Sequence, residues 1–432
     1  MNIDKFNSVI NNQMLVYTGK VTKIVGMAIE CEGPISNIGD ICEIHSQSGA
    51  KKLLAEVVGF RDKNILMMPL GNIEGIGPGC KVISNGQKLS VKVDSSLLGN
   101  VVDWQAKPIS GKEINCQFEV PIENEAPNPL LRTRISKQLV LGIKAIDGML
   151  SVGRGQRMGI FAGSGVGKST LMGMVARNAL SDINVIALIG ERGREVREFI
   201  EKDLQEAGLK RSIVVVATSD QPALMRLKAA KTATALAEFF RSQGKDVLLL
   251  MDSLTRFSMA QREVGLSIGE PPISRGYTPS VFGIMPKLLE RAGNDDKGSI
   301  TGLYTVLVDG DDFNEPITDT ARGILDGHIM LSRKLAHKAH YPAIDVLSSI
   351  SRVMGDITTR EHRQAMTQIK RYMAIYNEAE DLINVGAYNK GSNAEIDEAI
   401  EKHPSINNFL NQSTHDNVPL KETLEIMMEI VQ

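Results

Sequence analysis

A glycine-rich loop followed by a lysine and a serine is the stretch of this sequence best suited to chemistry. It reads IFAGSGVGKSTL, and its phosphate-binding candidates are Gly163, Ser164, Gly165, Val166, Gly167, Lys168, Ser169 and Thr170. The apolar residues before the loop predict the end of a buried strand, and the pattern after it predicts a helix. Backbone N–H groups of such a loop bind phosphate at a helix N-terminus. A lysine there reaches the β- and γ-phosphates and the serine hydroxyl ligates Mg²⁺, so the loop predicts binding of a nucleoside triphosphate.

One position of the loop departs from the usual pattern, because Ala162 stands where a glycine is common. An alanine there costs little if its backbone φ is negative. The alternative is a glycine-rich turn with only a structural role. The Gly-Lys-Ser sequence between a predicted strand and a predicted helix argues against it.

Two carboxylates follow other predicted strands. Asp252 ends the apolar run 248–251, and nucleotide sites lie at the carboxyl ends of parallel strands. We therefore expect Asp252 to hold Mg²⁺ through a coordinated water; the alternative is a cap on the next helix. Glu191 follows the predicted strand 185–189 and has the position to polarise an attacking water. Its neighbour Arg192 would steady it or contact phosphate, but a salt-bridged helix start with Glu195 explains the same residues equally well.

Phosphoryl transfer also needs a positive charge that stabilises the equatorial oxygens of the transferred group. Arg352 follows the strand-like run 346–351 and is one candidate. The residues alone do not distinguish it from the other arginines.

The N-terminal part of the chain has the pattern of a small β-barrel. Short β-type runs separated by glycine fill residues 14–95, with turn signals at Gly39-Asp40 and Asn85-Gly86. A proline-rich connector over residues 105–130 follows. Its prolines argue against a continuous helix and mark a domain boundary; they are Pro108, Pro121, Pro127 and Pro129.

The remaining sequence predicts an α/β core and a helical tail. Between residues 139 and 351, continuous apolar runs alternate with helical patterns, as in a parallel sheet covered on both faces. The clearest strands are 185–189, 213–217, 247–251 and 303–308, and the clearest helices are 195–207 and 223–241. After residue 356 helix formers dominate, with helical periodicity over 360–384 and 420–431. We therefore divide the chain into residues 1–95, 96–355 and 356–432.

Composition excludes several classes of protein. The net charge is −2 and aromatic residues make up only 4%, which argues against a nucleic-acid partner. The N-terminal residues 1–12 lack the pattern of a signal peptide, and no apolar run reaches the length of a membrane span, so a cytoplasmic protein is expected. The widely spaced cysteines suggest neither a zinc site nor a disulfide framework and are expected to be buried thiols: Cys31, Cys42, Cys80 and Cys116.

Longer stretches resemble the catalytic subunits of rotary ATPases, and the flagellar and type III secretion export ATPases in particular. The similarity covers residues 132–353 almost without interruption. It is carried by the phosphate loop with its flanks and by IGERGREVREF, LLLMDSLTRFSMAQREVGLSIGEPP, RGYTPSVF, YTVLVDGDDFNEPITD and HYPAIDVLSSISRV. The resemblance implies a RecA-like P-loop core with a parallel sheet, an N-terminal β-barrel and a C-terminal helical domain.

The resemblance also implies roles for individual residues. Each would serve hydrolysis of ATP with Mg²⁺: Lys168 and Arg192 as phosphate contacts, Ser169 and Asp252 at the metal, Glu191 as general base, Tyr341 stacked on adenine, and Arg352 as a finger reaching a neighbouring subunit's γ-phosphate. Tyr341 has core packing as its alternative. The loop 269–283 would face the central channel of a homohexamer, or else be a rigid surface turn.

The function implied is that of a flagellum-specific, protein-secreting ATPase that energises type III export. Alternatives are the ATPase of a virulence type III secretion system and, further off, a catalytic subunit of a rotary ATP synthase. Expected partners are further copies of the chain, a central coiled-coil stalk, a stator-like negative regulator, the export gate and chaperone–substrate complexes. The protein would lie peripherally at the inner face of the cell membrane. Acidic residues of the tail form either a solvated face or a docking surface for a basic partner.

Overall fold

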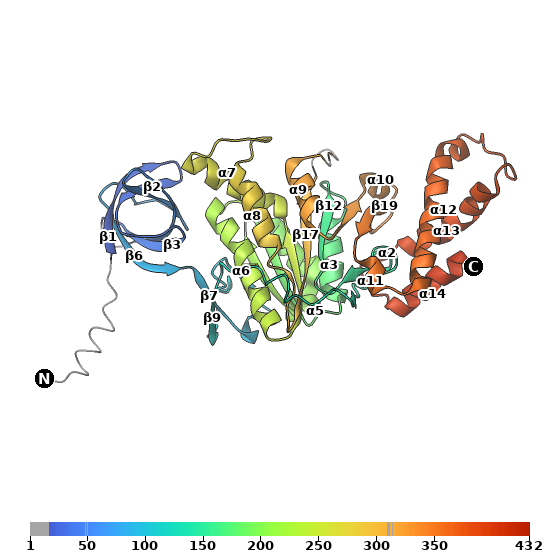
Figure 1. The fold of residues 1–432 in the computed structure, drawn as a ribbon, viewed down its shortest axis with the longest axis horizontal. Helices are drawn as coiled ribbons and strands as arrows, with labels where there is room; N and C mark the ends of the chain where they lie inside the picture. The colour runs from blue at the N-terminus through green and yellow to red at the C-terminus, as the bar shows by residue number, and fades with distance from the viewer. Residues whose placement is uncertain (1–16, 48, 50, 309–311, 313) are drawn as a thin grey trace.

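The computed structural model describes residues 17–47, 49, 51–308, 312 and 314–432. The described chain forms a closed barrel at one end, a sheet between helices in the middle and a helical part at the other end (Figure 1). This order confirms the predicted fold class. Residues 1–12 and 14–16, on which two of the expectations above fall, lie outside the described residues. Among the described helices, none combines the length and apolar character that crossing a membrane requires.

The barrel is antiparallel, and its strands follow one another in the order β1-β2-β5-β4-β3-β6. Along β3 burial alternates residue by residue, because successive side chains of a strand point to opposite faces. Three of the four cysteines lie buried in this part as free thiols, and Cys116 is partly exposed. The strands are β1 (Tyr17–Val25), β2 (Ala28–Glu32), β3 (Asp40–His45), β4 (Lys52–Arg61), β5 (Asn64–Pro69) and β6 (Lys81–Lys88).

One predicted turn of the barrel is wrong. Gly39 does lie in a turn just before β3, but Asn85-Gly86 lies inside β6. The pairing of β3 with β6 shifts register there, and Gly86 has a φ of +64°. The glycine therefore supplies the left-handed residue of a β-bulge, in which the strand continues past extra residues instead of reversing.

The proline-rich connector contains no helix between residues 105 and 130, as predicted, and most of its residues are exposed, whereas the segment before it is packed against the central part. After β7 (Ser90–Val93) and the short helix η1 (Ser95–Leu97), β8 (Val101–Val102) joins the edge of the central sheet beside β14. Trp104 is buried, and its carbonyl accepts a 2.7 Å hydrogen bond from the Thr232 hydroxyl. The strand β9 (Phe118–Pro121) then pairs back onto β7.

The central sheet has nine strands, with β16 beside β17 and the others in the order β19-β18-β12-β17-β15-β13-β14-β8. All neighbours along that order are parallel except β18 and β19, which are antiparallel. The strands after β9 are β10 (Gln138–Leu139) and β11 (Val152–Gly153), which form a separate pair, and β12 (Arg157–Ala162), β13 (Ile183–Ile189), β14 (Ser212–Ala217), β15 (Asp246–Asp252), β16 (Gly293–Asn294), β17 (Ser299–Leu307), β18 (Gly327–Leu331) and β19 (Ile344–Ser351).

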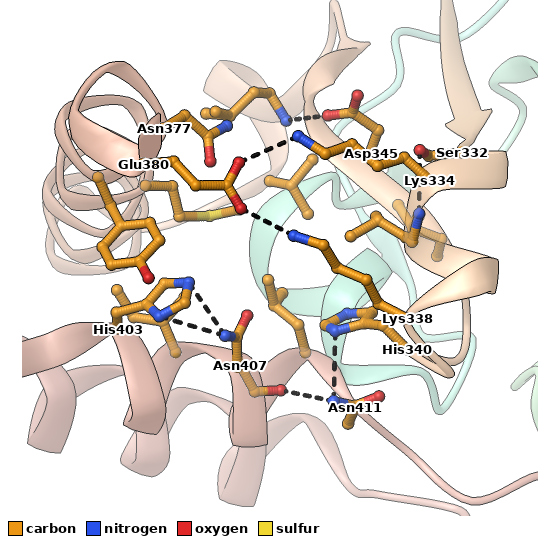
Figure 2. Close-up of a pocket in the computed structure, with 18 residues that line it drawn as sticks. Ser332, Lys334, Lys338, His340, Asp345, Asn377, Glu380, His403, Asn407 and Asn411 are labelled. Carbon is orange, nitrogen blue, oxygen red and sulfur yellow. Dashed lines mark hydrogen bonds and ion pairs between the residues drawn. The ribbon is translucent and has the colours of Figure 1, made fainter. Parts of the chain in front are cut away.

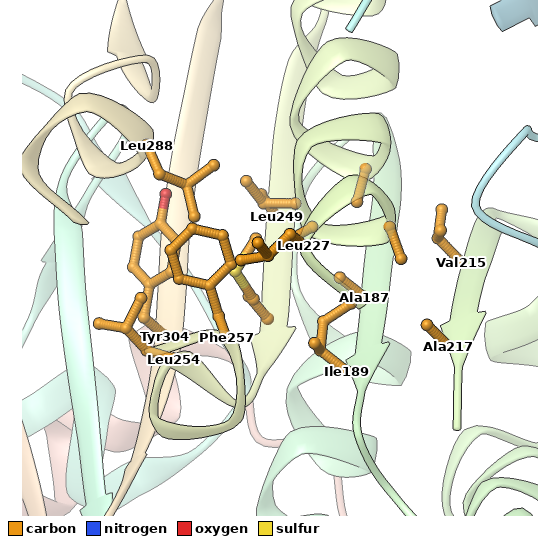
Figure 3. Packing of buried hydrophobic residues seen from close by; sticks show 14 of the residues in the cluster. Ala187, Ile189, Val215, Ala217, Leu227, Leu249, Leu254, Phe257, Leu288 and Tyr304 are labelled. Carbon is orange, nitrogen blue, oxygen red and sulfur yellow. The ribbon is translucent and has the colours of Figure 1, made fainter. Parts of the chain in front are cut away.

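Helices cover both faces of this sheet, and each face has its own apolar core. Alternate residues of β15 enter different cores: Leu249 packs on one side and Leu250 on the other. Figure 3 shows the first core, where Leu227, Phe257 and Leu288 come from three different helices. The helices of the central part are α2 (Lys144–Met149), α3 (Lys168–Asn178), α4 (Gly193–Glu198), α5 (Gln205–Lys210), α6 (Ala223–Ser242), α7 (Leu254–Ile268), α8 (Pro279–Leu289), α9 (Pro316–Ile324) and α10 (Arg333–His337).

The predicted helix over residues 195–207 is helical but interrupted. A π-helical turn, η2 (Phe199–Leu204), separates α4 from α5, and Gln205 has a φ of +58°. The turn packs tightly on α3, since a side chain at Gly173 would lie within 2.8 Å of the Asp203 backbone. Helical periodicity alone does not reveal such a local change of pitch.

The helical tail consists of α11 (Met354–Ile357), α12 (Arg360–Asn384), α13 (Ala394–Leu410) and α14 (Leu420–Val431). The bounds of α12 and α14 agree with the prediction, whereas α13 was not predicted. Asn393 caps α13 by accepting hydrogen bonds from two backbone N–H groups. Several acidic side chains of the tail have partners within the chain: Glu380 pairs with Lys334 and Lys338, and Glu395 pairs with Arg371.

A buried ion cluster joins the barrel to the central part. The Lys228 ammonium on α6 lies 2.6 Å from Glu56 of β4 and 3.0 Å from Glu123, which also pairs with Lys231. Burial alone would lower the pKa of Lys228, but the two carboxylates outweigh it and raise that pKa. Burial raises the pKa of Glu56. The lysine is therefore the partner that makes burial of the Glu56 carboxylate tolerable.

We predict that Lys228→Met destabilises the folded protein by about 3–5 kcal/mol, because it leaves a buried carboxylate without its counter-charge. Thermal unfolding followed by circular dichroism measures the effect. Lys210→Met is the matched control, since Lys210 forms a solvent-exposed pair with Glu206; its melting midpoint should equal that of the unsubstituted protein. Equal midpoints for both variants would show that the cluster contributes no stability.

Candidate active site

The phosphate loop lies where the sequence predicts it. It connects the end of β12 to the start of α3, with Gly167 capping that helix. Gly165 and Gly167 have φ values of +78° and +89°, which require glycine at both positions. Ala162 is the last residue of β12, a buried strand position with negative φ, so alanine fits there as expected. The free N–H groups at the start of α3 thus form the expected anion-binding geometry.

The sheet brings Lys168, Asp252 and Glu191 together at the carboxyl ends of its parallel strands. The Lys168 ammonium lies 2.5 Å from Asp252 Oδ1 and 3.8 Å from Glu191 Oε1. Both acidic residues are less than 10% exposed. Oε1 of Glu191 accepts no hydrogen bond from the described residues, although it is buried. A buried carboxylate oxygen without a donor, aimed into a site beside a phosphate loop, has the arrangement needed to bind a water.

The electrostatics of the cluster suit a general base. Burial and the nearby Asp252 raise the pKa of Glu191 to about 7, against the opposing effect of Lys168. A base whose pKa lies near the working pH combines a useful ionised fraction with a real affinity for the proton.

Two residues of this site were missed by sequence reasoning. The Thr305 hydroxyl on β17 donates a 2.6 Å hydrogen bond to Asp252 Oδ1. The feature of the sequence that could have identified Thr305 is a hydroxyl residue within an otherwise apolar predicted strand. Arg256 on α7 lies against Gly190, and its charge lowers the pKa of Glu191. Its Nε is buried and has no hydrogen-bond partner among the described residues, but the sequence gave no sign that this arginine would lie here.

The residues present fit a magnesium ion. Ser169, exposed in the first turn of α3, and Asp252 offer hard oxygen ligands of the kind that Mg²⁺ prefers. The part of the chain that the structure describes holds no group of three or more His, Cys, Asp or Glu side chains arranged around a metal position. Such a sparse set suits a cation that takes its other ligands from phosphate oxygens and water. Thr170 differs from Ser169, because its hydroxyl contacts Asp203.

Tyr341 lies beside the phosphate loop although it is far away in the sequence. A Cβ atom on Gly167 would lie 3.6 Å from Cε1 of the tyrosine ring. The residue is 43% exposed, which disagrees with core packing. An exposed aromatic ring next to a phosphate loop offers a face on which a base can stack.

Arg192 is not directed into the site of its own chain. It precedes α4, its side chain is 73% exposed, and its guanidinium lies 3.5 Å from Glu195. This is the geometry of the salt-bridged helix start that the sequence left open.

Arg352 lies near the amino ends of the parallel strands, whereas the phosphate loop lies at their carboxyl ends. It follows β19, which runs antiparallel to β18, so it comes level with the start of β12 instead of its end. Its backbone N–H donates to the Asp326 carbonyl at 3.1 Å, and its exposed side chain contacts the Arg322 carbonyl. Within one chain, Arg352 therefore has no route to the site at Lys168.

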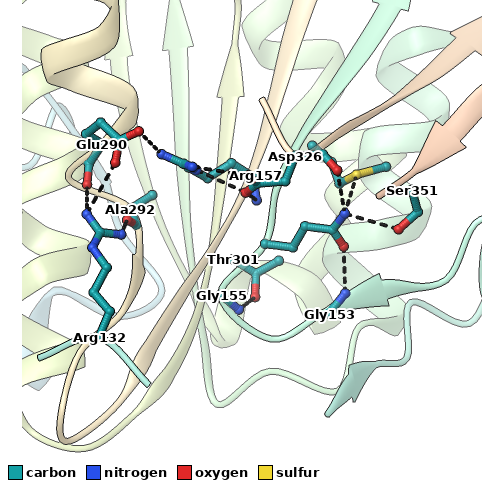
Figure 4. Close-up of polar contacts among 11 residues, drawn as sticks. Arg132, Gly153, Gly155, Arg157, Glu290, Ala292, Thr301, Asp326 and Ser351 are labelled. Atoms are coloured by element: carbon teal, nitrogen blue, oxygen red, sulfur yellow. Dashed lines mark hydrogen bonds and ion pairs between the residues drawn. The ribbon is translucent and has the colours of Figure 1, made fainter. Parts of the chain in front are cut away.

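A polar cluster fixes the backbone around Arg352 (Figure 4). The Arg157 guanidinium forms two hydrogen bonds with the Asp326 carboxylate, at 3.0 and 3.1 Å, and also pairs with Glu290. The Gln156 amide donates to the Asp326 carbonyl and to the Ser351 hydroxyl, both at 3.1 Å. The guanidinium of Arg352 is thus exposed, while the backbone next to it is held by these hydrogen bonds.

Comparison with known proteins was made with family models, curated sequences and solved structures. Models matched the ATP synthase alpha/beta family beta-barrel domain over residues 21–86, its nucleotide-binding domain over 142–351, and the T3SS EscN ATPase C-terminal domain over 358–429. The chain is 55% identical to the flagellum-specific ATP synthase of Bacillus subtilis, over 95% of this chain and 94% of that protein. It is 49% identical to the type 3 secretion system ATPase of Xanthomonas euvesicatoria, over 95% and 93% of the two chains.

A solved structure gives the same picture in three dimensions. The assembled ATPase EscN from the type III secretion system of enteropathogenic E. coli superimposes with a TM-score of 0.90 at 44% identity, over 96% of this chain and 100% of that one. EscN in complex with its central stalk EscO is similar to the same extent, with a TM-score of 0.89. The chain therefore belongs to the family of flagellum-specific ATP synthases and type 3 secretion system ATPases.

Proposed function

We propose that this protein hydrolyses ATP to energise type III export of flagellar proteins. The observation that carries the proposal is the convergence of Lys168, Asp252 and Glu191 beside a phosphate loop at one edge of a parallel sheet. Full-length similarity to flagellar and type 3 secretion ATPases supports it, since their barrel, nucleotide-binding part and helical tail occur here in the same order. We also propose that the boundaries between its three domains lie after residues 95 and 355.

The contacts suggest how this chain's residues act. Lys168 exchanges its ion pair with Asp252 for the β- and γ-phosphates, while loop N–H groups from Gly163 to Thr170 bind the same oxygens. Bound at Ser169 and Asp252, Mg²⁺ would neutralise charge on the phosphate oxygens. Glu191 orients a water and takes its proton as the oxygen attacks the γ-phosphorus. The bond to the β–γ bridging oxygen breaks, which yields ADP and inorganic phosphate.

The two arginines complete the proposed site. Arg352 of a neighbouring copy reaches the γ-phosphate. Arg352 cannot serve the site of its own chain, because it lies at the opposite ends of the parallel strands from that site. Arg192 would leave Glu195 to contact phosphate, and Tyr341 would stack on adenine. Similarity to the assembled EscN supports a homohexamer in which such contacts form between subunits.

Partners follow from the same comparison. EscN was solved in complex with its central stalk EscO, and we propose that a coiled-coil stalk passes through a ring of this protein. The loop 269–283, in which Ile273 is 61% exposed, would face that channel. A stator-like regulator, the export gate and chaperone–substrate complexes are the further partners proposed, with the ring held peripherally in the cytoplasm at the inner membrane face.

A virulence type III secretion ATPase is the second candidate, because relatives of both kinds match over the whole chain. A catalytic subunit of a rotary ATP synthase is a third and more remote candidate. We expect deletion of the coding sequence to abolish motility and export of flagellar proteins in the organism that carries it. A motile deletion strain that has lost secretion of virulence proteins would decide for the second candidate, and the swimming assay with a complemented control makes the distinction.

We predict that Glu191→Gln binds nucleotide but hydrolyses ATP about 10²–10⁴-fold more slowly, because the amide cannot accept the proton of the attacking water. Release of inorganic phosphate measures turnover, and equilibrium dialysis measures binding. Glu198→Gln, on the exposed surface of α4, is the control and should keep full activity, whereas Lys168→Ala should lose binding or hydrolysis. Normal turnover of Glu191→Gln would remove Glu191 from the mechanism.

Arg352→Ala should lower turnover without changing the fold, since its exposed side chain has a single hydrogen bond among the described residues, to the Arg322 carbonyl. The geometry makes a stronger prediction for mixtures. Rings assembled from Arg352→Ala and Lys168→Ala subunits should regain activity, because some interfaces then combine an intact lysine with an intact arginine. Phosphate release at varied mixing ratios tests this, and mixtures as inactive as either variant alone would contradict a finger acting between subunits.

A further inference from the structure

The backbone of Tyr341 is held from the helical tail. Its N–H donates a 2.9 Å hydrogen bond to Oδ1 of Asn411, and its carbonyl accepts a 2.9 Å bond from the N–H of Gln412. Asn411 and Gln412 directly follow α13, some seventy residues further along the chain. Both polar backbone groups of this tyrosine are therefore satisfied by two neighbouring residues of another part of the protein.

The side chain of Asn411 is itself fixed. Its Nδ2 lies 3.1 Å from the Asn407 carbonyl and 3.3 Å from Nδ1 of His340, and these contacts leave Oδ1 directed at Tyr341. Figure 2 shows Asn411 between Asn407 and His340 at one end of the pocket. Burial lowers the pKa of His340, so its ring is neutral near pH 7 and has an acceptor nitrogen for the asparagine amide.

Gln412 ties the same segment to the core of the central part. The residue is 6% exposed. Its Oε1 accepts from the N–H of Lys144 at 2.9 Å, and its Nε2 donates to the Gly142 carbonyl at 2.8 Å. Further along, the Arg177 guanidinium at the end of α3 donates to the Thr414 carbonyl at 2.5 Å. The segment 411–414 thus runs from Tyr341 to the helix that begins at the phosphate loop.

Elsewhere the interface combines a buried apolar core with a cavity. Phe409 and Met427 lie against Gly148 of α2, and His362 Nε2 donates a 2.7 Å hydrogen bond to the Gly148 carbonyl.

A cavity of about 410 Å³ separates the central part from α12 and α13, and the ion pairs across it, Lys334 and Lys338 with Glu380, involve exposed lysines (Figure 2). Exposed ion pairs contribute little stability. The specific contacts from the tail to Tyr341 therefore depend on Asn411 and Gln412, whereas the tyrosine hydroxyl donates a 3.4 Å hydrogen bond to the Ala336 carbonyl of the central part.

We propose that Asn411 is a positioning residue for recognition of the nucleotide base: it holds the Tyr341 ring beside Gly167, where the ring stacks on adenine. The inference rests on the proposed function, because it deepens the role of that site. Asn411 touches neither the phosphates nor the base. It acts through Tyr341, so its contribution belongs to the base-dependent part of the affinity and not to the part supplied by the phosphate loop.

Two ligands separate these parts of the affinity. Mg·ADP carries the base and Mg·pyrophosphate does not, and calorimetry with the full-length protein gives the Kd of each. Asn411→Ala should weaken Mg·ADP about five- to tenfold, the effect of one lost hydrogen bond, and leave Mg·pyrophosphate unchanged. Asn408→Ala, three residues earlier on α13 and exposed, is the control and should bind both ligands normally. In a Tyr341→Ala background, Asn411→Ala should cause no further loss.

The possible outcomes separate the two proposals. The positioning role would be overturned if Asn411→Ala weakened the affinity for both ligands equally or did not weaken the affinity for Mg·ADP. It would also be overturned if Asn411→Ala weakened Mg·ADP binding just as much in the Tyr341→Ala background. If Tyr341→Ala itself binds Mg·ADP as tightly as the unsubstituted protein, this inference fails while the proposed ATPase stands. Absence of binding of both ligands to the unsubstituted protein would instead refute the proposed function.

Discussion

The ammonium of Lys168 lies between two buried carboxylates, 2.5 Å from Asp252 and 3.8 Å from Glu191, and this group of charges constrains the rest of the fold. Two carboxylates repel each other, and burial makes both expensive, so the lysine is needed to hold them near one another. A triphosphate competes for the same ammonium. In the proposed mechanism, binding would free Asp252 for a cation and leave Glu191 facing the γ-phosphate. Such an exchange works only if the three side chains come from rigid elements, which is what the buried parallel strands provide.

The topology of the sheet places Arg352, the proposed arginine finger, at the opposite ends of the parallel strands from the phosphate loop. Because β19 reverses direction against β18, the chain reaches Arg352 level with the beginning of β12 and not with its end. If Glu191 is the base and Arg352 the finger, as proposed, a chain that carries them at opposite ends of its strands needs a neighbour to complete a site. The polar cluster of Arg157, Asp326 and Gln156 (Figure 4) gives that arginine a firm base. In the proposed ring, strand order would thus link assembly to catalysis.

The sequence revealed those features whose causes are local. The glycine positions of the phosphate loop, the continuous apolar strands and the carboxylates that end them each follow from the backbone or from burial, and they were predicted. Asn85-Gly86 was misread because the same left-handed glycine serves a turn or a bulge, and only the partner strand decides between them. Thr305, Arg256 and Asn411 were missed for another reason. Their roles depend on contacts between distant segments, and no spacing along the chain encodes such contacts.

The two flanking parts are attached to the ATPase core by different physics, and this difference bears on function. The barrel is joined through a buried ion cluster, in which Lys228 is only 3% exposed, and breaking such pairs is costly. The helical tail is joined through a shared apolar core, in which Phe409 and Met427 lie against Gly148, and through hydrogen bonds of Asn411 and Gln412 beside a cavity of about 410 Å³. Because Asn411 and Gln412 bond both polar backbone groups of Tyr341, the position of the tail is coupled directly to the backbone of that tyrosine.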